Sequence, residues 1–207
     1  MSLYAIGDLH LSFNSDKSMD KFGEEWVNHA EKIRKNWCEI VSEKDTVVVT
    51  GDHSWGRKLE DSMADLEFIT SLPGRKILLR GNHDRFWNKV NKTEELNELF
   101  QNKLSFLQNN FYVYTEEKSG KEYALIGTKG FSVDDYCYLA PDKIEKRFEN
   151  EKKRLMKSYE AAKMAGYENF IMFLHYPPTN KYEKTGLFTK IAHKLGVEQV
   201  VYSHLHG

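Results

Sequence analysis

Short apolar runs recur along the chain, and most of them are followed by a glycine or a polar cluster. They are rich in β-branched or aromatic residues, and runs this short and this uniformly apolar are typical of strands buried on both faces. The pattern predicts a strand at residues 3–6, 46–50, 76–80, 111–114, 123–127, 170–174 and 199–202.

Between several of these runs, apolar residues return at three- and four-residue spacing, which is the signature of an amphipathic helix. The spacing predicts helices over 22–41, 63–72 and 144–162. Pro73-Gly74 is expected to end the second helix and Gly166 the third. The dense charge that runs through the third segment is then the solvated face of that helix rather than a nucleic-acid patch.

The order of these elements predicts an α/β fold. Strands and helices alternate over the first 80 residues, which favours parallel pairing. Strand-like runs within 100–136 flank the turn-like residues 119–121, which predicts a local antiparallel pair. Two packed sheets with outer helices fit this order. Because the sequence has no repeat, low-complexity tract or linker, we expect residues 1–207 to form a single domain.

Composition narrows the setting and the partners. Hydrophobic residues make up 40% of the 207 residues and charged residues 29%, which is typical of a globular protein. Lys and Arg number 30 against 31 acidic residues, so charge does not favour a nucleic-acid partner, although it does not exclude one. Cys38 and Cys137 lack any metal-binding spacing. With no leader pattern and no window of ~18 apolar residues, we expect a cytoplasmic protein without a membrane partner.

The residues with chemistry follow the predicted strands directly. In open α/β sheets, ligands bind beyond the carboxyl ends of the strands. Here five strand ends deliver carboxylate, imidazole or carboxamide groups, and histidine is not a helix-capping residue. The candidate metal ligands are Asp8, His10, Asp52, Asn82, His175, His204 and His206.

All seven candidates are nitrogen or oxygen donors, and none is a thiolate. They are too many for one tetrahedral zinc and about right for two ions that share a bridging carboxylate. The D-x-H and H-x-H spacings put both side chains of each pair on one side if the backbone is extended there. Mixed imidazole and carboxylate ligation suits Mn, Fe or Zn better than Mg. A mononuclear zinc hydrolase is an alternative interpretation.

The order of five motifs resembles the calcineurin-like metallophosphoesterase superfamily. The motifs are GDLH at 7–10, GD at 51–52, GNHD at 81–84, a lone histidine at 175 after an apolar strand, and HLHG at 204–207. The sequence around 51–87 is most similar to a bacterial branch whose usual patterns are GDISW and GNHDYWW. The chain departs from the family in two ways. It has Ser203 where GHLHG is usual, and relatives normally continue for a few more strand-like residues.

The resemblance implies a four-layer α/β/β/α sandwich of two mixed sheets flanked by helices, with the C-terminal edge strand in question. It also implies a dinuclear site for two divalent ions, which the donor types indicate are Mn or Fe, with Zn as the alternative. Carried onto the matching positions, Asp8, His10 and His206 would bind one ion. Asn82, His175 and His204 would bind the other, with Asp52 as the bridge. His83 would act as a catalytic residue near the leaving group, oriented by Asp84.

The function that follows is hydrolysis of a phosphomonoester or phosphodiester, by in-line attack of a metal-bridging hydroxide at the dinuclear centre. The phosphoester substrate stays unidentified among protein, nucleotide and nucleic acid. The alternative is a metal- or protein-binding scaffold that has lost turnover. His53 is expected to be a neutral substitution on its loop, and a contact to the substrate or behind the metal ligands is the alternative. Trp55, Phe86 and Trp87 would either pack beneath the loops or form a stacking wall for the substrate.

Overall fold

The computed structural model describes residues 1–88, 92–132, 138–179 and 185–205. The chain forms two compact units, Met1–Phe106 and Leu107–Gly207. Each unit has its own four-stranded sheet and its own apolar core.

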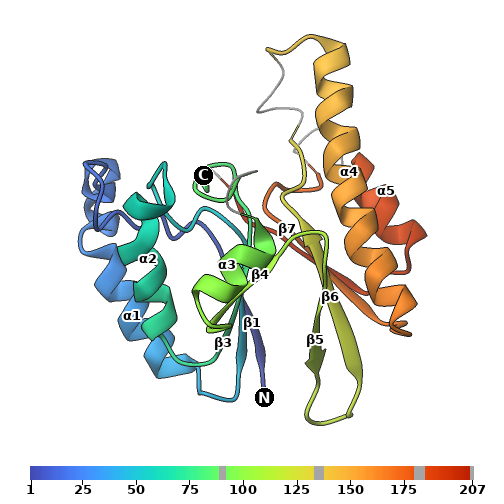
Figure 1. Ribbon diagram of the computed structural model, residues 1–207, viewed down its shortest axis with the longest axis horizontal. Helices are drawn as coiled ribbons and strands as arrows, with labels where there is room; N and C mark the ends of the chain where they lie inside the picture. The colour runs from blue at the N-terminus through green and yellow to red at the C-terminus, as the bar shows by residue number, and fades with distance from the viewer. Residues whose placement is uncertain (89–91, 133–137, 180–184, 206–207) are drawn as a thin grey trace. The chain divides into compact units, whose positions relative to one another are not determined.

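The sheet of the first unit has the order β1-β2-β3-β4, coloured blue to green in Figure 1. Its strands are β1 (Leu3–Ile6), β2 (Thr46–Val49), β3 (Arg75–Leu79) and β4 (Leu104–Leu107). β2 is parallel to both β1 and β3, with Thr46 opposite Leu3 on one side and Arg75 on the other. The carboxyl ends of these three strands therefore lie along one edge of the sheet, as the sequence predicts.

The helices of the first unit are α1 (His29–Ile40), α2 (Leu59–Ser71) and α3 (Thr93–Leu99). The predicted helix over 22–41 is wrong in its first part, because α1 begins only at His29. Two 3-10 turns, Met19–Phe22 and Glu24–Trp26, precede it. Gly23 at φ 139° and the left-handed Asn28 at φ 54° interrupt a continuous helix there.

One apolar core joins these helices to the sheet. Val47, Val49 and Leu78 from the strands pack with Trp37 of α1 and Leu66 of α2, all of them buried. The Trp37 indole also donates to the carbonyl oxygen of Pro73 at 3.0 Å. This packing fixes the strands whose ends carry the candidate ligands.

The second unit has the strand order β5-β6-β7-β8. Its strands are β5 (Tyr112–Thr115), β6 (Glu122–Thr128), β7 (Phe170–Leu174) and β8 (Gln199–Val201), and its helices are α4 (Pro141–Met164) and α5 (Leu187–Lys194). β5 and β6 are antiparallel, which confirms the pair predicted around 119–121, whereas β7 is parallel to β6 and β8. The buried Glu151 of α4 accepts a 2.6 Å hydrogen bond from Thr128 and so ties this helix to the end of β6.

The predicted class, two sheets with flanking helices, is confirmed. The sequence patterns did not single out β4, α3 or α5, which are short. Within the described ranges, no helix combines the length and the apolarity that crossing a membrane requires.

Candidate metal centre

Three loops of the first unit carry most of the candidate ligands. We define loop 1 as residues 7–13 after β1, loop 2 as 50–56 after β2, and loop 3 as 80–85 after β3. Loops 1 and 2 continue the parallel pairing of their strands. The amides of Asp8, His10 and Leu11 donate to the carbonyl oxygens of Gly51, Asp52 and His53 at 3.0, 2.9 and 3.0 Å.

The backbone turns sharply at three candidate ligands in these loops. Asp8, His10 and Asp52 have φ values of 56°, 44° and 56°, in the left-handed region that non-glycine residues rarely occupy. Such positions cost of order 1–3 kcal/mol each and cluster at functional sites. The extended geometry assumed for the D-x-H pair is therefore wrong, and left-handed turns, not strand alternation, aim the two side chains.

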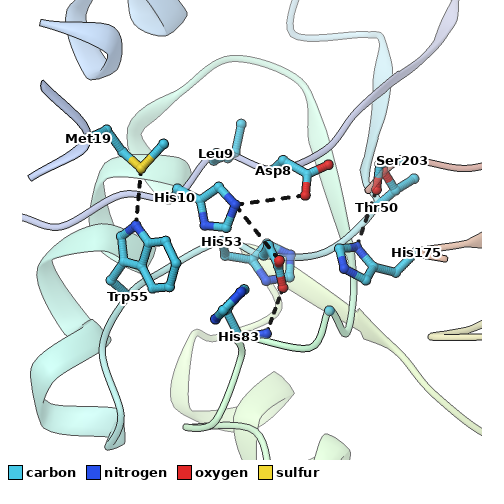
Figure 2. A network of polar contacts seen from close by, with 12 residues as sticks. Asp8, Leu9, His10, Met19, Thr50, His53, Trp55, His83, His175 and Ser203 are labelled. Carbon is cyan, nitrogen blue, oxygen red and sulfur yellow. Dashed lines mark hydrogen bonds and ion pairs between the residues drawn. The ribbon is translucent and has the colours of Figure 1, made fainter. Parts of the chain in front are cut away.

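The turns bring one imidazole and two carboxylates together. His10 Nε2 lies 3.9 Å from Asp8 Oδ1 and 3.8 Å from Asp52 Oδ2, and Figure 2 shows His10 pointing to Asp8. Because nitrogen and carboxylate ligands sit roughly 2.0–2.2 Å from a divalent ion such as Zn²⁺, two ligand atoms of one ion can lie up to about 4 Å apart. This donor set therefore fits a divalent ion that prefers mixed nitrogen and oxygen ligation.

Asp52 is held from loop 3 while one of its oxygens faces His10. The amide of His83 donates to Asp52 Oδ1 at 2.8 Å. A Cβ atom at Gly81 would overlap the Asp52 carboxylate, so this close approach of the two loops requires glycine. Burial, together with the negative charges of Asp84 and Asp8, raises the pKa of Asp52 to about 8 despite hydrogen bonds from backbone amides. A bound cation would offset this accumulation of negative charge.

Asp84 forms the reciprocal link from loop 3 to loop 2. Its carboxylate is fully buried and accepts from the amides of Asp52, His53 and Gly81 at 2.9, 2.9 and 2.7 Å. Burial alone would raise the pKa of Asp84, but the charge and hydrogen bonding of His53, with the backbone amides, lower it below its ordinary value. The contacts described for Asp84 thus fix the loops, while its predicted role in orienting His83 stays a prediction.

His53 does not behave as a neutral substitution on its loop. It is fully buried, and its Nδ1 lies 2.9 Å from Asp84 Oδ2. Sequence reasoning missed this contact because the partner is 31 positions away along the chain. The one available signal was a histidine at a position where related sequences carry an apolar residue.

The aromatic residues near the loops divide into two groups. Phe86 and Trp87 are fully buried in the core of the first unit, so they pack beneath the loops and form no wall for substrate. Trp55 instead contacts two candidate functional residues. Its ring is stacked on His10 at 4.6 Å between centroids and meets His83 edge-on at 4.3 Å. Figure 2 shows its indole nitrogen directed at Met19, 3.3 Å from the sulfur.

The second unit brings His175 and His204 together. His175 follows β7 and is buried, and its ring centroid lies 4.8 Å from that of His204. His204 is also left-handed, at φ 58°. Ser203 Oγ lies 3.3 Å from His175 Nδ1, a contact that Figure 2 marks. If Nδ1 carries the proton in this contact, Nε2 has the lone pair with which a histidine can bind a metal ion.

The remaining candidates lie as follows. Asn82 is half-buried in loop 3, and its backbone amide acts on the Asp52 carboxylate. His83 is half-buried, with its ring 5.5 Å from that of His10. His206 lies outside the described residues. Within each unit, the described candidates are therefore assembled at the ends of consecutive strands.

The chain matches a known protein family and a curated relative. The family model for calcineurin-like phosphoesterase matches residues 1–207. The gene 66 protein of Mycobacterium phage L5 is 32% identical over 77 residues, which are 37% of this chain and 37% of the phage protein. The match thus spans well under two thirds of that relative.

Two solved structures match the chain over most of its length. Phosphopantetheinyl hydrolase (PptH) from Mycobacterium tuberculosis has a TM-score of 0.58 at 14% identity, over 99% of this chain and 82% of that one. A protein of unknown function from Aquifex aeolicus, AQ665, has a TM-score of 0.46 at 18% identity, over 98% of this chain and 90% of the other.

The two-sheet architecture fits a calcineurin-like sandwich, and the family is one of metal-dependent phosphoester hydrolases. The match to the family covers every motif that contains a candidate ligand. The chain therefore belongs to the calcineurin-like phosphoesterase family.

Proposed function

We propose that the chain hydrolyses phosphomonoesters or phosphodiesters with two divalent ions, Mn or Fe, or alternatively Zn. The ligands would be the seven residues Asp8, His10, Asp52, Asn82, His175, His204 and His206, with Asp52 serving both ions. When bound, two such ions supply a hydroxide nucleophile at neutral pH and neutralise the phosphoryl oxygens.

One observation carries this proposal. His10 Nε2 lies 3.9 Å from Asp8 Oδ1 and 3.8 Å from Asp52 Oδ2, although all three residues adopt a left-handed backbone to meet there. A structural role alone gives no reason to bring two carboxylates together with an imidazole at a cost in strain. The pairing of His175 with His204 in the second unit supports the same chemistry with further nitrogen ligands.

His83 is proposed to donate a proton or a hydrogen bond to the leaving oxygen as the P–O bond breaks. The Trp55 ring, edge-on at 4.3 Å, and the hydrogen bond from the His83 amide to Asp52 hold it beside the proposed ligands. In this role the imidazolium works on the substrate and is not itself a ligand. Its removal should spare metal binding while turnover falls by about 10²–10⁴-fold.

The test combines metal content with turnover. Wild type, Asp52→Asn, His83→Ala and the control His193→Ala, an exposed histidine on α5, are loaded with Mn²⁺, and bound metal is measured by mass spectrometry. Each protein is then assayed on p-nitrophenyl phosphate and bis-p-nitrophenyl phosphate. We expect two equivalents and hydrolysis of at least one ester for wild type and His193→Ala, and loss of metal for Asp52→Asn. For His83→Ala we expect two equivalents with turnover lowered by about 10²–10⁴-fold.

Other combinations of metal content and turnover would favour a different function or a different role for His83. Two equivalents without hydrolysis of either ester would favour a metal-binding scaffold. A single equivalent that survives Asp52→Asn would favour a mononuclear site. Full activity in His83→Ala, or loss of its metal, would remove His83 from the proposed role.

A further inference from the structure

Asp65, on α2, is a buried carboxylate outside the candidate site. It is fully buried and lies in the first unit among apolar residues such as Leu66 and Ile69 of the same helix. Burial raises the pKa of this carboxyl, while its hydrogen bonds with Ser54 and Phe13 act the other way. Burying a carboxylate costs free energy unless its oxygens accept hydrogen bonds. The two hydrogen bonds that Asp65 accepts therefore indicate what its burial serves.

Both bonds go to loops that carry candidate ligands. The amide of Phe13, three residues after His10, donates to Asp65 Oδ1 at 2.8 Å. The hydroxyl of Ser54, two residues after Asp52, donates to Asp65 Oδ2. Ser54 is fully buried and accepts in turn from the amide of Gly56 at 2.9 Å. One carboxylate on a rigid helix therefore holds the far ends of loops 1 and 2 together.

Asp65 and Asp84 together connect all three loops. Asp65 fixes loop 1 to loop 2, and Asp84 fixes loop 2 to loop 3 through the amides of Asp52 and Gly81. Leu11 and Ser54 form a parallel β-bridge at the point where Asp65 contacts the loops. The left-handed turns at His10 and Asp52 thus lie between anchored points on both sides.

We infer that Asp65 is a positioning residue for the metal centre, which acts through Phe13 and Ser54 to hold His10 and Asp52 at a distance one ion can bridge. This inference rests on the proposed function of the site. Partners that orient metal ligands in this indirect way typically contribute 10–100-fold to metal affinity or activity. The strained turns make such support more important, because without an anchor they would relax.

The test measures Mn²⁺ affinity and steady-state kinetics on the same proteins. Asp65→Asn preserves shape but replaces an acceptor by a donor toward Ser54, and Ser54→Ala removes only the hydroxyl. Glu67→Gln, an exposed carboxylate on the same helix, is the matched control. We expect Asp65→Asn to weaken Mn²⁺ binding about 10–100-fold and lower kcat more than it raises KM, Ser54→Ala to have a smaller effect of the same kind, and Glu67→Gln to match wild type.

A double-mutant cycle separates positioning from general stability. If Asp65 acts through His10, Asp65→Asn should change Mn²⁺ affinity far less in a His10→Ala background than in wild type. Equal effects in both backgrounds, or a lowered Tm with unchanged Mn²⁺ affinity, would overturn the inference. Should Asp65→Asn not fold, Ser54→Ala takes its place in the cycle with His10→Ala, and the same two results would overturn the inference.

The outcomes for the two proposals differ. Wild type that binds Mn²⁺ but hydrolyses no ester would end the proposed function, and the affinity cycle would still decide on Asp65. Active wild type with unchanged Mn²⁺ binding in Asp65→Asn would end the positioning role alone. Absence of Mn²⁺ binding by wild type would contradict both.

Discussion

At the scale of single residues, the site depends on buried polar side chains that contact no substrate in the proposed mechanism. Asp84 accepts from three backbone amides and contacts His53, so protein groups compensate its negative charge. A buried charge whose partner is removed costs far more than an exposed one. His53 therefore contributes to the stability of loops 2 and 3, whatever its part in catalysis.

We predict that His53→Leu lowers the free energy of unfolding by about 3 kcal/mol, because it leaves part of the buried Asp84 charge uncompensated. His53→Asn should cost about half as much, because its amide nitrogen can take the place of Nδ1. Urea unfolding in the presence of a chelator measures the effect without any contribution from metal. His193→Ala serves as the control, and equal stability of the Leu and Asn variants would contradict this account.

The sequence predicted which residue types gather at the strand ends, but not these supports. Asp8, His10 and Asp52 could be found because each follows an apolar run directly. Asp65 could not, since a lone carboxylate on a helix looks like a surface charge until its burial and its contacts with Phe13 and Ser54 are seen. His53 was misjudged because its burial and its contact with Asp84 are likewise not visible in the sequence.

At the scale of elements, strands were predictable because their apolar runs are continuous, whereas helix starts depended on local backbone conformation. β1 and β7 coincide with their predicted runs. α1 begins seven residues later than its apolar spacing suggests. The spacing of apolar residues carries no information about the positive φ of Gly23 or Asn28. The short α3 and α5 offer too few turns for a periodic pattern to stand out.

Asp45 shows how one side chain joins several elements. Its carboxylate accepts from the amides of Ser2, before β1, and Ser42, after α1, while its carbonyl accepts from the amide of Arg75 at the start of β3. The Ser42 hydroxyl also donates to it, at 2.6 Å. Hydrogen bonds from the Ser42 side chain and backbone, and from Ser2, lower the pKa of Asp45 from 3.8 to about 2.

We predict that Asp45→Asn lowers stability at neutral pH and that this deficit disappears in acid. The folded-state pKa lies below the unfolded value, so the ionised carboxylate stabilises the fold above 3.8, and this contribution is lost as pH falls from 3.8 to about 2. Urea midpoints of both proteins between pH 7 and pH 2 measure it, and other carboxyl groups cancel in the difference. A deficit that stays constant with pH, as expected for Glu67→Gln if it has any, would contradict the prediction.

At the scale of the whole molecule, the proposed ligands come from two units that each have a separate sheet and core. Asp8, His10, Asp52 and Asn82 belong to the first unit, and His175, His204 and His206 to the second. The proposed function therefore requires that metal binding stabilise segments of both units. A site complete within the first unit would not require this.

Hydrogen exchange with and without metal tests this requirement. At a free Mn²⁺ concentration of 100 times Kd, binding stabilises the native state by about 2.7 kcal/mol, or roughly 100-fold in exchange protection for segments whose opening releases a ligand. We expect Mn²⁺ to protect loops 1 to 3 of the first unit, as well as His175 and the peptide from Gln199 onward in the second. Amides within β2 and β7 exchange only when the core opens, which also releases the ligands, so their protection should rise as well. Amides of the 119–121 turn between β5 and β6, whose local opening leaves the proposed ligands in place, should change much less.

The pattern of protection also identifies which ligands bind. Asp52→Asn should abolish the response in both units, because its carboxylate is proposed to serve both ions. Protection confined to loops 1 to 3 would instead mean that Asp8, His10 and Asp52 hold a single ion without the second unit, and the dinuclear proposal would fail. Because β8 has only three residues, few backbone hydrogen bonds hold this segment, and it should open at a low free energy. The peptide from Gln199 to Leu205 should therefore show the largest change of all if His204 is a ligand.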